Sequence, residues 1–280
     1  MRSCRRGFTL TEIMLALVVT LVVAGAVYNL LLATQRVTRA QTDRIAIQSA
    51  LRAGSLIVLN ELSELSTAIG DTPDQNDVLA MSPTAITYRA MRGTGFICHV
   101  AAPTIIRLAQ GAFSGHRLPQ AGRDQAYVFV SGHPAPEVKD SWAAAKIVAV
   151  TTALPCPAGL GPGITLTLSA SPSAELLEPG TPVRITELME LRPYRADDAV
   201  WLGARAVSTG EAIQPLVGPL AGSDGFVLEY LDSGGGPTAN RGSITTIQVT
   251  LRGLLDSQKG GDRAAEELVT LVPLRNSPAS

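Results

Sequence analysis

The beginning of the chain shows two successive patterns of apolar and polar residues. From Ile13 to Gln35 no side chain is charged. At about 1.5 Å per residue this run gives roughly 34 Å of helix, enough to cross a bilayer core of about 30 Å. Beyond Arg36 the apolar residues recur at spacings of three, four and seven, which is typical of a helix with one buried face. We therefore predict one helix with a membrane half, residues 8–35, and an amphipathic half, residues 36–70.

The apolar positions of the amphipathic half form a single stripe along the predicted helix. We predict that the helix ends at Gly70, because glycine is favoured just past the last turn and Pro73 cannot continue a helix. A helix with one apolar face must lie against a folded domain. The stripe consists of Ile47, Leu51, Val58, Leu62, Leu65 and Ile69, with Gly54 in the gap.

After Pro73 the chain changes to short β-type runs separated by Pro, Gly and Ser. Segments 164–168 and 247–251 alternate apolar and polar side chains, as antiparallel strands with one solvated face do. The fold class we predict is therefore α+β, with a long N-terminal helix packed on an antiparallel β-sheet domain of residues 71–280. The predicted strands are 85–91, 95–100, 104–109, 126–131, 146–152, 164–170, 183–192, 199–208, 226–231, 244–252 and 267–274.

Glu12 is an unusual residue, because it lies at the edge of the apolar run. An ionisable group costs about 2.5–3.5 kcal/mol at the centre of a membrane, so it normally has a functional partner. A secretory signal peptide fits poorly, since its apolar region is short and its small residue follows that region, whereas Gly7 precedes it. A plain single-pass anchor would explain the length, with Glu12 near the positive end of the helix dipole, but it leaves Gly7 and Phe8 unexplained.

The run Gly7-Phe8-Thr9-Leu10-Thr11-Glu12, set between an arginine-rich head and an apolar helix, resembles the processing site of type IV prepilins and type II secretion pseudopilins. The resemblance implies that residues 1–7 are a leader removed by prepilin peptidase and that Phe8 becomes the N-methylated first residue. It also implies that Glu12 meets the N-terminal amine of an adjoining subunit during assembly. The spacing agrees, because positions i and i+4 of a helix are neighbours.

Short runs in the second half resemble the larger minor pilins of the W type and the minor pseudopilins of the J type. This resemblance favours a minor over a major subunit, as does the size of the chain, and it implies a place in a small complex at the fibre tip that primes assembly. The runs are 186–194, 201–203, 214–220, 226–232 and 274–276.

The charge distribution predicts the orientation in the membrane. Arg2, Arg5 and Arg6 precede the apolar run, so the positive-inside rule places the N-terminus in the cytoplasm and the C-terminal domain outside the inner membrane. Loss of the leader takes Lys+Arg from 23 to 20 against 24 Asp+Glu, which changes the formal charge from −1 to −4. We expect no nucleic acid partner, because no basic cluster is visible.

Two of the three cysteines remain after Cys4 leaves with the leader. Cys98 and Cys156 would lie in an oxidising compartment, where a disulfide forms readily. The alternative is a pair of separate buried thiols.

We find no sequence signal for catalysis or for a cofactor. His99, His116 and His133 have no companions at metal-ligand spacing, and no nucleophile elbow, Walker loop or dinucleotide fingerprint is present. Clustered oxygen donors at Asp71, Asp74, Asn76 and Asp77 suit calcium, as in some secretion pseudopilins; the alternative is a solvated loop.

Two functions therefore stay open. One is a structural subunit of a type IV pilus or type II secretion pseudopilus, with prepilin peptidase, the inner membrane and other major and minor pilin or pseudopilin subunits as partners. The other is a membrane-tethered adhesin or binding module that uses the pilin export route.

Overall fold

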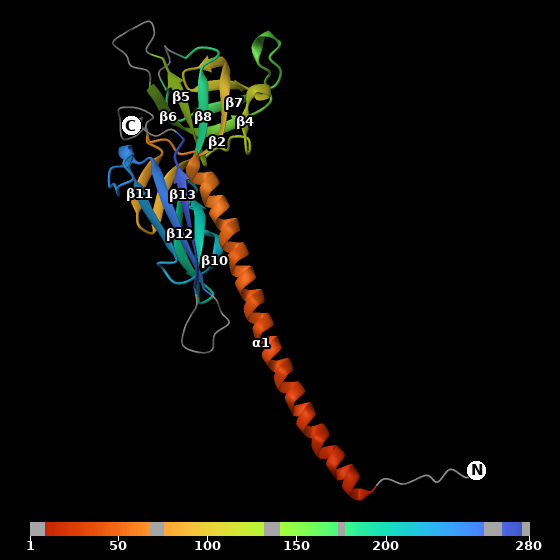
Figure 1. Cartoon of the computed structure of the whole chain (residues 1–280). Coiled ribbons are helices and arrows are strands. Elements are labelled where there is room, and N and C mark those ends of the chain that lie inside the picture. The colour runs from red at the N-terminus through yellow and green to blue at the C-terminus, as the bar shows by residue number, and fades with distance from the viewer. Residues whose placement is uncertain (1–8, 68–75, 132–140, 173–176, 255–264, 276–280) are drawn as a thin grey trace, which may run out of the picture.

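A computed structural model of the chain describes residues 9–67, 76–131, 141–172, 177–254 and 265–275. It consists of one long helix, α1, whose second half packs on a large antiparallel β structure while its first half projects alone (Figure 1). At about 1.5 Å per residue the 54 residues of α1 span about 80 Å. The predicted α+β class, with a long N-terminal helix on antiparallel strands, is confirmed.

The β structure contains thirteen strands and three short 3-10 helices within the described residues. The helix α1 spans Leu10–Ser63 and the 3-10 helices are η2 Gln110–Ala112, η3 Pro157–Gly159 and η4 Arg241–Ser243. The strands are β1 Val78–Ser82, β2 Ala85–Ala102, β3 Ile105–Ala109, β4 Ser114–Gly115, β5 Asp124–Val130, β6 Ser141–Thr151, β7 Gly163–Leu168, β8 Pro182–Ala196, β9 Ala199–Ala206, β10 Gln214–Leu220, β11 Phe226–Leu231, β12 Thr246–Leu254 and β13 Ala265–Pro273.

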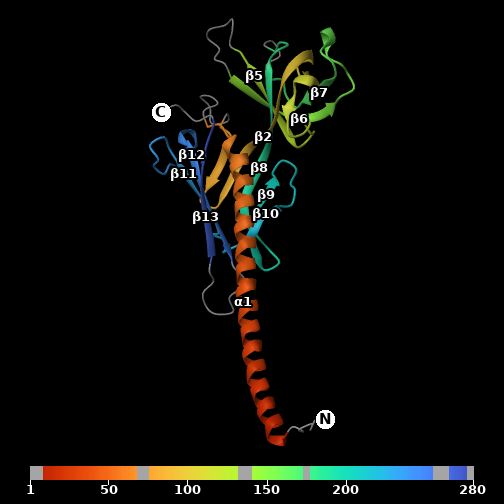
Figure 2. The same cartoon turned by 45° about the vertical axis from the view of Figure 1, so that its right-hand side comes forward.

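Six of the strands close into an antiparallel barrel, which we call the barrel lobe. Following the pairings gives the order β2, β3, β7, β6, β5, β8, and β8 pairs back to β2. The lobe lies beyond the end of α1 (Figures 1 and 2). Its interior is filled by apolar side chains from the six strands and from Leu177. They are Ile97, Ile106, Leu108, Ala126, Val128, Ala145, Ile147, Ile164, Leu166, Leu168, Leu177, Val183 and Ile185.

The second half of α1 packs in a separate apolar core, which defines the helix lobe. Its buried residues include Leu51, Val58 and Leu62 of α1, which face side chains of β1, β2 and β8–β13. At Gly54 an added Cβ would lie 2.7 Å from the Cβ of Val217 on β10, so only glycine lets the helix approach the sheet this closely. The predicted stripe is therefore the buried face of the helix from Leu51 to Leu62, whereas Ile69 lies outside the described residues.

Strands β2 and β8 are long because they belong to both lobes. The first half of β2 pairs with β1 and its last part pairs with β3, while β8 remains its partner from Ile86 to Phe96. The predicted strands 85–91 and 95–100 are thus parts of one strand, with a bulge between Met91 and Gly93. The barrel strands between β2 and β8 form an insertion within one antiparallel strand pair.

The helix ends at Ser63, earlier than the predicted Gly70. Tertiary contacts replace the helical ones beyond that point: the Ser63 carbonyl accepts from the Arg275 amide, and the Ser66 amide donates to the Asp77 carboxylate at 2.9 Å. Leu65 of the predicted stripe stays 1% exposed in the core without being helical. Strands β1, β4 and β10 were not predicted, because β4 has only two residues and the other two show no clear alternation; residues 214–220 were noted only among the runs that resemble minor pilins.

Candidate functional site

The first turn of α1 is closed by a capping box between Thr9 and Glu12. The Thr9 amide and the Thr9 hydroxyl both donate to Oε2 of Glu12 at 2.9 Å, and the Glu12 amide donates to the Thr9 hydroxyl at 3.4 Å. This arrangement satisfies free N–H groups at a helix start. Gly7 and Phe8 lie outside the described residues. The sequence interpretation missed the role of Thr9, although the Thr-x-x-Glu spacing was visible.

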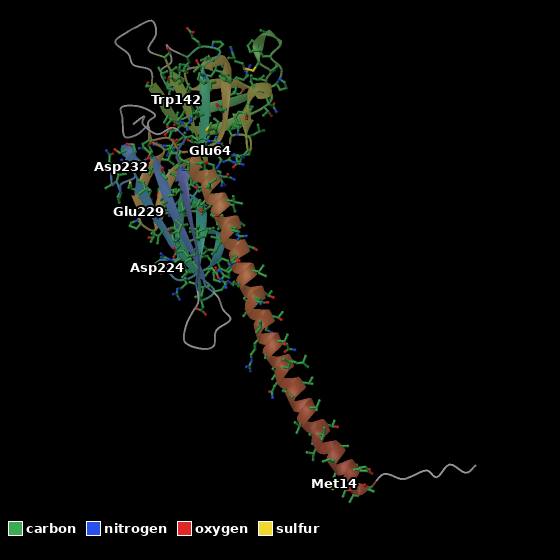
Figure 3. All side chains as sticks on the ribbon, in the orientation of Figure 1. Met14, Glu64, Trp142, Asp224, Glu229 and Asp232 are labelled. Carbon is green, nitrogen blue, oxygen red and sulfur yellow. A yellow bond between two sulfur atoms is a disulfide. The ribbon has the colours of Figure 1, made fainter. Side chains whose placement is uncertain are left out.

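No other described element of the chain covers the first half of α1. Large apolar side chains from Leu10 to Leu31 are exposed, and they project from the helix on every side, as Figure 3 shows around Met14. The helix is long and apolar enough to cross a membrane. Exposed apolar surface of this extent needs lipid or other apolar helices as its surroundings.

A shallow hollow on the helix surface begins at Glu12. Small residues follow Glu12 at four-residue spacing, namely Ala16, Thr20 and Ala24, and larger apolar side chains border them. The Thr20 hydroxyl donates to the Ala16 carbonyl at 2.7 Å, so it leaves no polar group unsatisfied there. Small residues on one helix face allow another helix to approach closely in a membrane. The face that carries Glu12 is thus shaped for a neighbouring helix.

Three exposed apolar side chains lie on the helix half that packs in the helix lobe. Ile45 and Leu56 are on the side opposite the buried stripe, and Ile57 is on its flank. Within the described residues no element of this chain covers them.

The far end of α1 meets a layer of buried charges between the two cores. Glu187 of β8 has a side chain only 2% exposed, and it receives Arg92 Nε at 2.6 Å, Arg117 Nη2 at 3.3 Å and Arg123. Arg92 also binds Glu61 of α1, with Nη1 and Oε1 3.1 Å apart. The layer therefore connects the helix, β2 and β8 at the point where both strands pass from one lobe to the other.

Further ion pairs extend this layer toward the barrel. Asp124 at the start of β5 is fully buried and accepts two hydrogen bonds from Arg117, at 2.6 and 2.7 Å. The amide of Gln120 donates to the same carboxylate at 2.7 Å. Buried carboxylates are tolerated only when they are paired and hydrogen-bonded, and both acids here are.

The arginines determine the protonation of Glu187. Burial alone would raise the pKa of Glu187, but the hydrogen bonds and charges of Arg92 and Arg123 outweigh burial and hold the pKa below its usual value. The pKa of Asp77 moves the other way, because burial raises it more than the charge of Arg184 lowers it. Glu187 is therefore ionised at neutral pH.

Cys98 and Cys156 are joined by a disulfide, with their Cα atoms 5.8 Å apart. The bond ties β2 to the connection between β6 and β7, both in the barrel lobe. Of the two arrangements that the sequence left open, the structure has the disulfide.

Replacing both cysteines by serine is expected to lower the free energy of unfolding by about 2–4 kcal/mol, because the bridge restricts a long loop of the unfolded chain. Denaturant unfolding of the full chain in detergent measures the loss, and reduced wild type should show a similar one. Alkylation of both thiols in unfolded, unreduced wild type would show that the bridge is absent.

The predicted calcium ligands are only partly described. Asp71 and Asp74 lie outside the described residues. Asp77 is buried, and its Oδ2 receives the Ser66 amide at 2.9 Å and Arg184 at 3.1 Å. Among the described residues no group of three or more His, Cys, Asp or Glu side chains is placed to hold a metal ion. The Asp77 carboxylate therefore joins the segment that follows α1 to Arg184 of β8.

Comparison with known proteins identifies the N-terminal segment. Residues 2–28 match the family model described as the prokaryotic N-terminal methylation motif. The match includes Gly7, Phe8 and Glu12. Searches of curated proteins and of solved structures gave no match. The chain thus carries a prepilin-type N-terminal methylation motif, and the helix that follows is long and apolar enough to anchor it in a membrane.

Proposed function

We propose that this pilin-like protein, which carries the prepilin processing motif, is a minor subunit of a type IV pilus or type II secretion pseudopilus. It is cleaved and N-methylated by prepilin peptidase and joins a small tip complex with other pilin-like subunits. The observation that carries the proposal is the exposed apolar half of α1, which follows Glu12 and has no partner among the described residues. Such a surface needs lipid or other apolar helices around it, and the core of a fibre supplies such helices.

The surfaces of α1 support assembly on both sides of the membrane boundary. The small-residue face beside Glu12 suits a helix in the membrane, and the exposed side chains of Ile45 and Leu56 suit contact with a neighbouring subunit outside it. In this arrangement the N-terminus starts in the cytoplasm and both lobes lie outside. Before assembly the chain is an inner-membrane protein; afterwards it is part of a fibre.

The barrel lobe favours a minor over a major role. It adds a closed barrel at the end of the molecule away from the bare helix (Figure 2). A subunit packed many times along a fibre has neighbours above and below it, so such bulk is easier to accommodate at the tip. The same lobe favours the second candidate, a ligand-binding module exported by the pilin route. In both cases we propose a binding and structural role without catalysis or cofactor.

Glu12→Gln is expected to abolish or strongly reduce entry into the fibre or tip complex while leaving insertion, cleavage and folding normal. The amide keeps the shape of the side chain and removes the charge that would pair with the amine of a neighbouring Phe8. Co-purification of pilin-like subunits with the full chain from membranes measures assembly. An unfolding curve measures the stability of the two lobes.

Asp43→Asn is the matched control, because it removes one carboxylate from the same helix beyond the apolar run. It should assemble like wild type. Normal assembly of Glu12→Gln would refute the pairing role of Glu12. A wild-type chain that brings no other pilin-like subunit with it would refute the proposed function itself.

A further inference from the structure

The first charged residues after Glu12 are Arg36 and Arg39, which lie just past the apolar run of α1. Both of their side chains are exposed. From Glu12 to Arg36 the helix rises about 36 Å, whereas the hydrocarbon core of a bilayer is about 30 Å thick. When α1 crosses a membrane with Glu12 at one boundary of the core, Arg36 therefore lies at the other boundary.

The segment that carries the two arginines stands free of both lobes (Figure 1). Side-chain contacts with the helix lobe are made further along α1, by Arg44 and Gln48, which both bind Glu266 of β13. Residues 36–42 are exposed throughout and give about 10 Å of helix between the apolar run and the lobe. The headgroup layer on each side of a bilayer is about 5–7 Å thick. Because the two arginines are about 4.5 Å apart along the helix axis, both fit within that layer.

The guanidinium groups of this pair have no counter-ion in the chain. Among the described residues, no carboxylate forms an ion pair with either of them, not even Asp43, which is one helical turn after Arg39. Arg44 differs, because its Nε lies 2.5 Å from a carboxylate oxygen of Glu266. Positions three apart on a helix are neighbours, so Arg36 and Arg39 point to the same side. A guanidinium fork matches the oxygens of a phosphate group, and the pair therefore offers unused donors for phosphate.

We propose that Arg36 and Arg39 bind the phosphate groups of anionic phospholipids in the leaflet nearest the two lobes, and so fix the depth of α1 in the membrane. Lipid headgroups are the anions that the exposed apolar run brings to this position. The aliphatic stems of the arginines can lie along the apolar helix while their charged ends stay in the headgroup layer. Each arginine near an anionic membrane surface strengthens attraction about fivefold.

The inference rests on the proposed function only for the direction of insertion, which puts the two arginines on the outer side of the inner membrane. In that orientation the positive-inside rule gives no reason for arginines directly after the apolar run. Phosphate binding gives one, because it holds the unassembled subunit at a defined depth. Entry into a fibre then has to break these contacts.

The test is electron paramagnetic resonance of spin-labelled phosphatidylglycerol in phosphatidylcholine vesicles that contain the full chain. The association constant of this lipid, relative to spin-labelled phosphatidylcholine, measures how strongly the protein selects anionic lipid. We expect wild type to prefer phosphatidylglycerol about fivefold or more. Arg36→Gln combined with Arg39→Gln should reduce the preference about fivefold or more. High salt should weaken the wild-type preference, because the Debye length falls from about 10 Å at 0.1 M to about 3 Å at 1 M.

Arg52→Gln is the matched control. Arg52 is also exposed on α1, but it lies about 24 Å beyond Arg36 along the helix and therefore outside the headgroup layer. It should select lipid like wild type, and an unchanged unfolding midpoint shows that each variant is folded. An unchanged preference in the double variant, or an equal loss in Arg52→Gln, would overturn the inference. So would a double variant that keeps the lipid preference but no longer co-purifies with other pilin-like subunits, because the arginines would then pair with a neighbouring subunit.

These results are separable from the proposed function. Lipid selection that depends on the two arginines, in a chain that brings no other pilin-like subunit with it, would keep the lipid site and refute the fibre subunit. Assembly that depends on Glu12 without any selection of anionic lipid would do the reverse.

Discussion

Gly7→Leu is expected to leave the leader attached and to abolish assembly completely. The residue before the scissile bond must fit the peptidase closely, and glycine has no side chain to obstruct it. Without cleavage the amine of Phe8 does not form, so Glu12 has no cation to pair with. Arg2, Arg5 and Arg6 also stay on the chain, and each would cost about 2.5–3.5 kcal/mol at the centre of a membrane.

Mass spectrometry of the chain isolated from membranes decides this prediction. Wild type should begin at an N-methylated Phe8, and Gly7→Leu should retain residues 1–7. Gly7→Ala is the control, because its small side chain should still permit cleavage. A Gly7→Leu chain that is cut and assembled like wild type would show that processing does not depend on this residue.

Glu187→Ala is expected to lower the free energy of unfolding by about 3–5 kcal/mol, the usual cost of removing one partner from a buried ion pair. The substitution removes the carboxylate shared by Arg92, Arg117 and Arg123. Because Arg92 lies between the two cores, water cannot fully replace the lost carboxylate as its partner. Denaturant unfolding of the full chain in detergent measures the change. Both lobes should lose stability, because β2 and β8 pass through the charged layer.

Glu267→Ala is the matched control for this variant. Glu267 also pairs with an arginine, Arg252, but its side chain is 48% exposed. Surface ion pairs contribute about 0–1 kcal/mol, so this control should unfold nearly like wild type. Equal effects of the two substitutions would show that the layer at Glu187 contributes no more than a surface pair.

The same layer predicts how stability depends on pH. The pKa of Glu187 is lower in the folded chain than in the unfolded one, so its contribution is present above the unfolded value of about 4.3 and is lost as the pH falls through the folded value. The pKa of Asp77 is higher in the folded chain than in the unfolded one, so ionisation of Asp77 favours the unfolded chain as the pH rises. The stability difference between wild type and Glu187→Gln should therefore be constant above about pH 5 and shrink in acid.

The sequence by itself predicted the features that depend on neighbouring residues along the chain. Three features depend only on spacings of a few residues: the apolar run from Ile13 to Gln35, the processing motif and the stripe of α1. In a helix such spacings determine which side chains share a face. Most strands were found for the same reason, since alternation with a period of two is a local pattern. The capping box at Thr9 and Glu12 was equally local and was overlooked.

Only the tertiary structure decided where elements end and how they are joined. α1 stops at Ser63 because Arg275 and Asp77, distant in sequence, supply hydrogen bonds that replace the helical ones. The barrel closes because β8 pairs with both β2 and β5, and strand pairing across such separations leaves no trace in local periodicity. Glu187 looks like any strand glutamate in the sequence. Its burial among three arginines exists only once the two lobes meet, since Arg92 comes from β2 whereas Arg117 and Arg123 come from the connection between β4 and β5.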